Sequence, residues 1–266
     1  MLTSAVVQAP AVRRIKRYGW IPDLPDHRDR LFSAPSGIVL PPRVDLREGC
    51  PPVYDQGQLG SCTAHAIAGA VEFVMRRQAL EDTFTPSRLF IYYNERVIEG
   101  TVDEDAGAML RDGIKSVARL GAPHERLWPY QIANFREKPV PPVYRDGLLH
   151  QALLYRRVQQ TPDQLRACLA AGFPFVFGFA VYESFESQSV TRTGRVPMPR
   201  PHEAMLGGHA VLAVGYDDRA GLFSIRNSWG DEWGDHGYGT MPYSYLTDRN
   251  LSDDFWIITL VEEPPR

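Results

Sequence analysis

The first strong hydrophobic period in this chain begins near Ser61. Small and aliphatic residues recur from there at spacings of three and four: Ala64, Ile67, Ala68, Val71 and Met75. This period is typical of one face of an α-helix. The other faces also carry small residues, namely Ala66, Gly69 and Ala70. We therefore expect a central helix with other elements packed closely against it.

Further helices are indicated mainly by their ends. Thr85 followed by Pro86 is typical of an N-cap and a first-turn proline. A helical stripe after Gly107 stops at Gly121, and its members are Leu110, Ile114, Val117 and Ala118. The segment from Thr161 has the spacing of a capping box and predicts another helix start.

The pattern changes to strands in the second half of the chain. Large residues alternate with smaller ones from Phe173 to Val181, which predicts a strand. Four more strands are expected at 209–216, 222–226, 237–243 and 255–260, the first two joined by a turn at 217–221. Helices followed by strands, with the change near residue 150, indicate an α+β fold with two lobes.

Residues 1–45 differ from the rest, because prolines interrupt them and no helical period runs through them. Large apolar residues nevertheless occur here: Trp20, Ile21, Leu24, Leu31 and Phe32. A solvated tail rarely carries so many. An extended strap over the surface is therefore favoured over a disordered tail.

Composition and charge exclude several classes of function. The 266 residues carry a formal net charge of -3, which gives no electrostatic reason to expect nucleic acid or an anionic membrane as partner. The most apolar run, Phe173–Tyr182, is far too short to span a bilayer. The N-terminus lacks a secretory pattern, so the chain is expected in the cytoplasm unless another route exports it. We expect a monomer.

Three cysteines, Cys50, Cys62 and Cys168, do not suggest a disulfide framework, although one pair would be possible. Cys62 follows a glycine-rich loop and stands at the predicted start of the central helix. Unpaired backbone N–H groups and the helix dipole favour a thiolate there. A small buried core residue is the alternative interpretation.

Three other features favour chemistry at Cys62. Gln56 lies six residues earlier, where its amide can donate to an oxyanion together with the Cys62 N–H. His209 begins a predicted strand after two glycines, and Asn227 lies on the return strand, where it can fix the histidine tautomer. Trp229 could shield that hydrogen bond from water.

These three stretches resemble the papain family of cysteine peptidases. The stretches are Gln56–Ala64, Gly207–Val211 and Asn227–Gly230, and His209 follows Cys62 by 147 residues, within the family's window of about 130–150. The resemblance covers residues from about 40 to 260. Leu59, Thr63 and His65 depart from papain itself, and in this the chain looks like bacterial members of the family.

The resemblance implies a role for each matching residue. Cys62 would be the nucleophile, His209 the general acid and base, and Asn227 its orienting partner, with Gln56 in the oxyanion hole. Gly107 would hold an extended substrate through its backbone, a weaker match because its neighbours are unusual. Trp229 would also contact the substrate.

The implied fold is α+β and papain-like, with the active site in a cleft between a helical left lobe (about 46–150) and an antiparallel, barrel-like right lobe (about 151–260). The peptidase domain would span 40–266, and residues 1–39 would form a strap resembling a pro-segment in position. The expected partner is a polypeptide substrate, with no cofactor and no metal. The strap is expected to contact the cleft and to limit access to it.

Alternatives remain open from the sequence. The same fold could serve a catalytically silent peptide-binding protein, or another acyl transfer. His202 also satisfies the spacing from Cys62 but lies in a proline-rich loop, and His65 is better explained as a packed polar residue. Cys50 and Cys168 have no metal-ligand companion at short spacing, so they do not indicate zinc.

Overall fold

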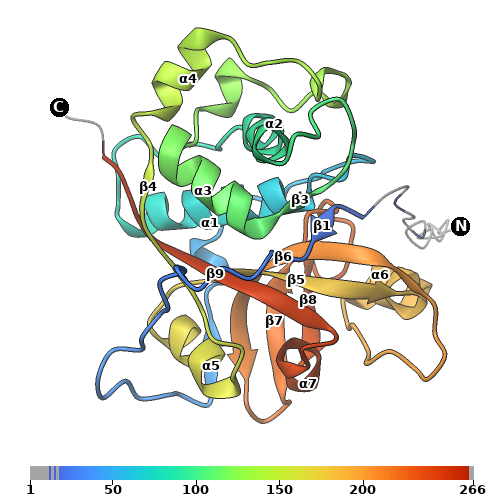
Figure 1. Cartoon of the computed structure of the whole chain (residues 1–266). Coiled ribbons are helices and arrows are strands. Elements are labelled where there is room, and N and C mark those ends of the chain that lie inside the picture. Colours follow the sequence, from blue (N-terminus) through green and yellow to red (C-terminus); the bar gives the residue numbers. More distant parts are fainter. Residues whose placement is uncertain (1–11, 13–14, 16–17, 264–266) are drawn as a thin grey trace, which may run out of the picture.

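A computed structural model describes Val12, Ile15 and residues 18–263, arranged as a helical half above a sheet (Figure 1). The helical half contains α1 (Cys62–Arg77), α2 (Arg88–Glu99), α3 (Leu110–Leu120) and α4 (Pro141–Gly147). Shorter helices flank the sheet: α5 (Pro162–Ala170), α6 (Gln188–Thr193) and α7 (Tyr243–Thr247). The expected α+β class is therefore correct.

The main sheet has seven strands, all paired antiparallel, in the order β4-β9-β5-β6-β7-β8 with β2 beside β6. Its strands are β2 (Arg43–Asp45), β4 (Ala152–Arg157), β5 (Phe175–Tyr182), β6 (Met205–Asp217), β7 (Leu222–Arg226), β8 (Tyr238–Pro242) and β9 (Ser252–Val261). Its edge strands β4 and β8 do not pair, so the described residues form no closed barrel.

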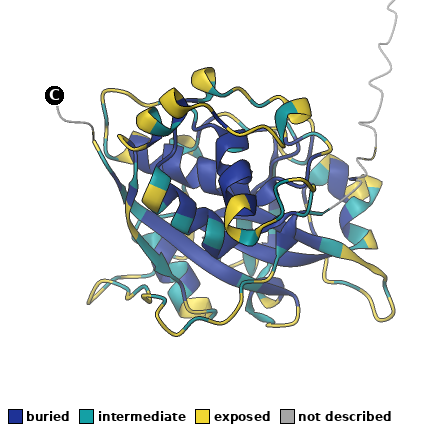
Figure 2. Ribbon diagram, turned by 45° about the horizontal axis from the view of Figure 1, so that its top comes forward, coloured by how far each residue is buried: buried dark blue, intermediate teal, exposed yellow. Residues whose placement is uncertain are grey.

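α1 lies at the centre of the molecule, as its small residues predicted. All of its residues from Cys62 to Met75 are buried, and Figure 2 shows buried, dark blue ribbon through the middle of the molecule. Its apolar residues join one core cluster with residues of β5, β6 and β9, among them Val176, Leu212 and Trp256. α1 therefore couples the helical half to the sheet.

Several expected boundaries are correct. α3 ends at Gly121 with φ of 72°, and the Thr161 side chain accepts the Gln164 N–H at the start of α5. The start expected at Thr85 is wrong. Ser87 caps α2 by accepting the Phe90 N–H at 3.2 Å, because Pro86 pairs in extended form with His124.

The N-terminal strap crosses the junction between the two halves. Its short strand β1 (Trp20–Ile21) pairs in parallel with β3 (Ala108–Met109), just before α3. Figure 1 places β1 between the helices and β6. None of the helices in the described ranges has the length and apolar character that crossing a membrane requires.

Candidate active site

Cys62 is the first residue of α1, and its side chain is fully buried. Its N-cap, Ser61, makes no side-chain cap to the helix, and the first turn holds no acidic residue. The Ser61 hydroxyl instead bonds the Tyr130 hydroxyl at 2.6 Å. No acidic residue of the first turn of α1 therefore offsets the positive end of the helix dipole.

His209 lies inside β6, opposite Phe179 of β5, and is fully buried. Its Nε2 is 2.8 Å from Asn227 Oδ1. Asn227 follows the last residue of β7, so the β6–β7 hairpin brings the pair together across 18 residues of sequence. The same Asn227 oxygen accepts the Ser228 N–H at 2.8 Å, which fixes the amide.

Aromatic rings enclose the His209 imidazole. Trp229 lies 5.3 Å away between ring centroids, Phe179 5.6 Å and Phe185 6.1 Å. Trp229 is itself buried. The rings pack around the imidazole that bonds Asn227; the shielding of this bond by Trp229 stays a prediction.

The thiol and the imidazole come from different halves of the molecule, and α1 packs against β6, the strand that carries His209. The backbone N–H of Ala210, the residue after His209, lies near the Cys62 sulfur and lowers the pKa of its thiol. Tyr18 of the strap lies against both, with its ring 6.1 Å from the His209 ring and its hydroxyl within electrostatic reach of Cys62. The structure thus places the strand that carries His209 beside the start of α1, where Cys62 lies.

Gln56 is buried in the loop before α1. Its Nε2 donates to the Leu59 carbonyl at 2.9 Å, and its Oε1 accepts the Ser228 hydroxyl at 2.6 Å. The amide is therefore held from both ends, by its own loop and by the residue after Asn227. An amide nitrogen has a second N–H, so one donor remains in addition to the bond to Leu59.

Comparison with known proteins gives a consistent result. A family profile described as papain family cysteine protease matches residues 40–246. The chain is 42% identical to an uncharacterized peptidase C1-like protein of Acanthamoeba polyphaga mimivirus, over 94% of this chain and 88% of the viral one. The chain belongs to the papain family of cysteine proteases.

Solved structures of the papain family agree with this assignment. Xylellain, a cysteine protease from Xylella fastidiosa, superposes with a TM-score of 0.85 at 44% identity, over 95% of this chain and 98% of xylellain. Procathepsin L 3 from the larval midgut of Tenebrio molitor has a TM-score of 0.66 at 18% identity, over 88% of this chain and 75% of that one, and supports the fold alone. The fold is papain-like, and the chain is a cysteine peptidase similar to bacterial xylellain.

In this papain-family chain the strap lies directly over Cys62. The Gly19 N–H lies near the Cys62 sulfur and lowers the pKa of its thiol, and the Gly19 carbonyl accepts the Ala108 N–H at 2.7 Å. Gly107, with φ of 79°, has no room for a side chain, because a Cβ there would lie 2.3 Å from the Gly19 oxygen. The strap thus occupies the backbone position expected to hold substrate.

Glycines of the sheet also make room for the strap. A Cβ on Gly178 would lie 1.9 Å from the Trp20 ring, and one on Gly208 would lie 2.6 Å from it. Gly207 faces Tyr18 in the same way. The glycine pair before His209 therefore accommodates the strap, a role that the sequence did not suggest.

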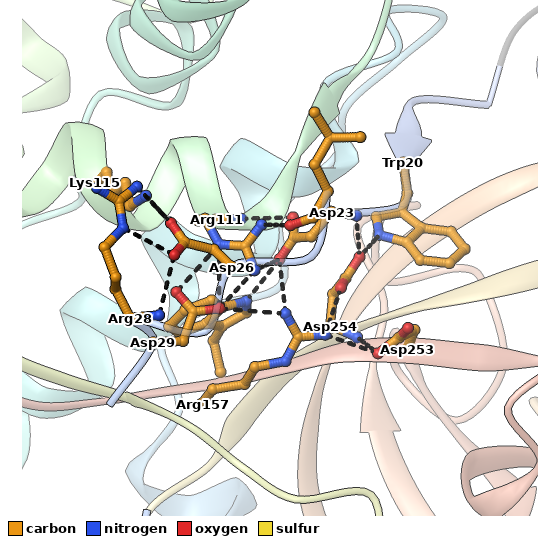
Figure 3. A network of polar contacts seen from close by, with 12 residues as sticks. Trp20, Asp23, Asp26, Arg28, Asp29, Arg111, Lys115, Arg157, Asp253 and Asp254 are labelled. Atoms are coloured by element: carbon orange, nitrogen blue, oxygen red, sulfur yellow. Dashed lines mark hydrogen bonds and ion pairs between the residues drawn. The ribbon is translucent and has the colours of Figure 1, made fainter. Parts of the chain in front are cut away.

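A buried charge network anchors the strap beyond Trp20 (Figure 3). Asp254 Oδ2 accepts the Trp20 indole N–H at 3.1 Å and the Asp23 N–H at 2.8 Å. Arg157 of β4 pairs with Asp254 at 3.0 Å, and Arg111 of α3 pairs with Asp29 of the strap. The anchor thus joins the strap to both halves of the molecule.

The pKa of Cys62 reflects its burial beneath the strap. Burial raises the pKa of the Cys62 thiol to about 12, while N–H groups of Ala210, Gly19 and Thr63 lower it and Glu95 raises it. Burial outweighs the helix terminus here, so the thiol is protonated at neutral pH.

The competing residues lie elsewhere or are satisfied by packing. His202 is exposed in its loop with φ of 66°. His65 is buried, its Nδ1 is 2.9 Å from the Ser61 carbonyl oxygen, and burial lowers its pKa well below the usual range. All three cysteines are free thiols, and Cys168 packs in the core of the sheet half.

Sequence reasoning missed four residues near the site. Ser228 supports Gln56, Tyr18 and Gly19 cover His209 and Cys62, and Asp105 accepts the Gly60 N–H at 3.0 Å. Ser228 lies within the Asn-Ser-Trp-Gly stretch, so its position next to Asn227 could have suggested it. No sequence motif around Gly19 indicates its role, because that role depends on the packing of the strap against Gly60 and Gly107.

Proposed function

We propose that this peptidase cleaves peptide bonds within polypeptides through Cys62, His209 and Asn227, and that residues 1–39 hold it latent. The observation that carries the proposal is the position of Gly19, between the Cys62 sulfur and the Ala108 N–H. An extended substrate would need the same place. Within the proposed strap and peptidase domain, residues 1–11, 13–14, 16–17 and 264–266 lie outside the described residues.

The chemistry begins once the strap leaves. Exposure to water removes the main cause of the raised Cys62 pKa, and the helix terminus then favours the thiolate. Because Asn227 holds Nε2 of His209, the Nδ1 nitrogen is the one that exchanges a proton with the thiol. The thiolate attacks the peptide carbonyl, and His209 gives its proton to the leaving amine.

The second half of the reaction releases the acid product. The acyl group is then a thioester on Cys62, and water attacks it while His209 accepts a proton. The Cys62 N–H and the second N–H of Gln56 would stabilise the oxyanion in both steps. Gly107 and Ala108 would hold the substrate backbone, with Trp229 on the sheet side.

The division at residue 39 is part of this proposal. The strap, 1–39, would act as a regulatory segment, and 40–266 would be the peptidase domain, with lobes of about 46–150 and 151–260. The family match from residue 40 supports the first boundary. A silent peptide-binding protein is the rival, but Cys62, His209, Asn227 and Gln56 are all present.

The test uses an internally quenched peptide blocked at both ends, which only an endopeptidase cleaves. The chain lacking residues 1–19 is expected to cleave it faster than the full chain, because the anchor at Asp23 and Asp29 remains while the cleft is opened. Cys62→Ala should abolish cleavage, whereas Cys168→Ala, a change at another buried thiol, should keep it. Equal rates for the full and shortened chains would refute latency, and activity in Cys62→Ala would refute the nucleophile.

A further inference from the structure

A cluster of two histidines and an aspartate lies within the helical half, away from the active site. His124 follows α3, Asp146 belongs to α4, and His150 lies between α4 and β4. One potential ligand atom from each lies within 4.8 Å of the other two. His124 Nδ1 and Asp146 Oδ2 are 2.9 Å apart, and the two histidine rings are 5.3 Å apart between centroids.

His150 points to a ligand because its Nδ1 is unsatisfied. The residue is 3% exposed, and among the described residues no group bonds this buried nitrogen. Buried polar atoms are otherwise almost always hydrogen-bonded.

The surroundings resemble the support of a metal ligand. His124 Nε2 is 2.9 Å from Asp82 Oδ2, so a carboxylate orients the ring from its far side. Metal-binding histidines commonly have such a partner on the second nitrogen. The Phe84 ring stacks on His124 at 3.6 Å and meets the His150 ring at 4.6 Å. One side of the cluster is thereby shielded from water.

We propose that His124, Asp146 and His150 together bind one Zn²⁺ ion. Two imidazole nitrogens and one carboxylate oxygen suit zinc, which binds them at about 2.0–2.2 Å. Ligands of a tetrahedral ion at those lengths lie roughly 3.4 Å apart, so the groups need to move by about 1–1.5 Å. The ion would replace the proton between His124 Nδ1 and Asp146, and a water would complete the shell.

The ion would act on stability rather than on hydrolysis. It would connect the segment after α3 to α4 and to the chain entering β4, and through Asp82 to the turn after α1. This proposal differs from the expectation of no metal, which considered only short spacings between ligands. Here His124 and Asp146 are 22 residues apart, and only the fold brings them together.

The test measures zinc binding to the full chain in a Cys62→Ala background, which removes the active-site thiol as a competing ligand. Metal is stripped with a chelator, and Zn²⁺ is added while bound metal and the thermal midpoint are recorded. The variants are His150→Gln, Asp146→Asn and Asp82→Asn. The matched control is His236→Gln, which alters an exposed histidine 3.4 Å from a carboxylate of Asp231.

We expect one zinc per chain and a rise in thermal midpoint on adding it. Both effects should be lost in His150→Gln and Asp146→Asn, kept in His236→Gln, and weakened about 10–100-fold in affinity by Asp82→Asn. No binding at micromolar zinc, or binding that both ligand variants retain, would overturn the proposal. If His150→Gln fails to fold, Asp82→Asn decides, since its side chain is 64% exposed; unchanged affinity there also overturns it.

Discussion

Replacing Gly19 by alanine should expel the strap from the cleft and activate the peptidase. An alanine Cβ at this position would lie 1.8 Å from the Gly60 oxygen and 2.4 Å from its carbonyl carbon. These are backbone atoms of the loop that leads into α1, so they cannot turn aside as a flexible side chain would. The strap is the partner that can move.

The size of the effect follows from this clash. Overpacking of a closely fitted site costs about 1–3 kcal/mol, and each 1.4 kcal/mol changes an equilibrium about tenfold. The open population should therefore rise by about 5–150-fold. The clash involves only the strap and the loop before α1. In molecules whose strap stays docked, its other contacts persist, among them the Trp20 hydrogen bond to Asp254, so the variant remains folded.

The assay compares initial rates on a fluorogenic peptide for wild type, Gly19→Ala and Gly37→Asn. Gly37 lies in the same strap with φ of 75°, and a Cβ there meets no atom within 4 Å. Asparagine tolerates that conformation, so Gly37→Asn serves as the matched control and should leave the rate unchanged. A rate for Gly19→Ala no higher than that of wild type, in a folded protein, would refute the reasoning.

Three further predictions concern the anchor and the site. Burial first, and then nearby Asp23, raise the pKa of Asp254 to about 7. The docked state therefore binds a proton that the open state loses, so docking of the strap weakens as the pH rises from about 4 to 7. Protease cleavage of the strap should increase over that range in wild type but much less in Asp254→Asn. Asn227→Ala removes the bond to His209 and should lower kcat/KM by about 10–150-fold, because a hydrogen bond to a charged group contributes about 1.5–3 kcal/mol. Replacement of the exposed Asn250 by alanine is the control, and a loss below threefold in Asn227→Ala would argue against the orienting role. Gln56→Ala should lower kcat by about 10²–10³-fold with little change in KM, and exposed Gln58→Ala should not; a change in KM alone would contradict an oxyanion role.

The sequence could predict what local patterns encode. The small-residue period from Ser61 gave α1 and its buried position, and the glycine and threonine signals gave the end of α3 and the start of α5. The helix start at Thr85 failed because tertiary pairing of Pro86 with His124 overrode a local preference. Short elements such as α4 and β4 carry too few residues for a period to show.

The sequence could predict the contacts between residues close in the chain or on paired strands, but not the contacts of the strap. His209 and Asn227 share a hairpin, so their proximity follows from strand pairing, and the loop before α1 places Gln56 near Cys62. The strap contacts join residues 234 positions apart, as Trp20 and Asp254 do. Such contacts depend on how two halves of the chain pack, and no short-range pattern records them.

The most direct test of the account is the site at which an epoxide inhibitor labels the chain that lacks residues 1–19. Peptide mass mapping should find one adduct per chain on Cys62, formed in parallel with loss of peptide hydrolysis and much more slowly in the full chain. Adducts on Cys50 or Cys168 instead, or hydrolysis that persists after Cys62 is fully modified, would contradict it.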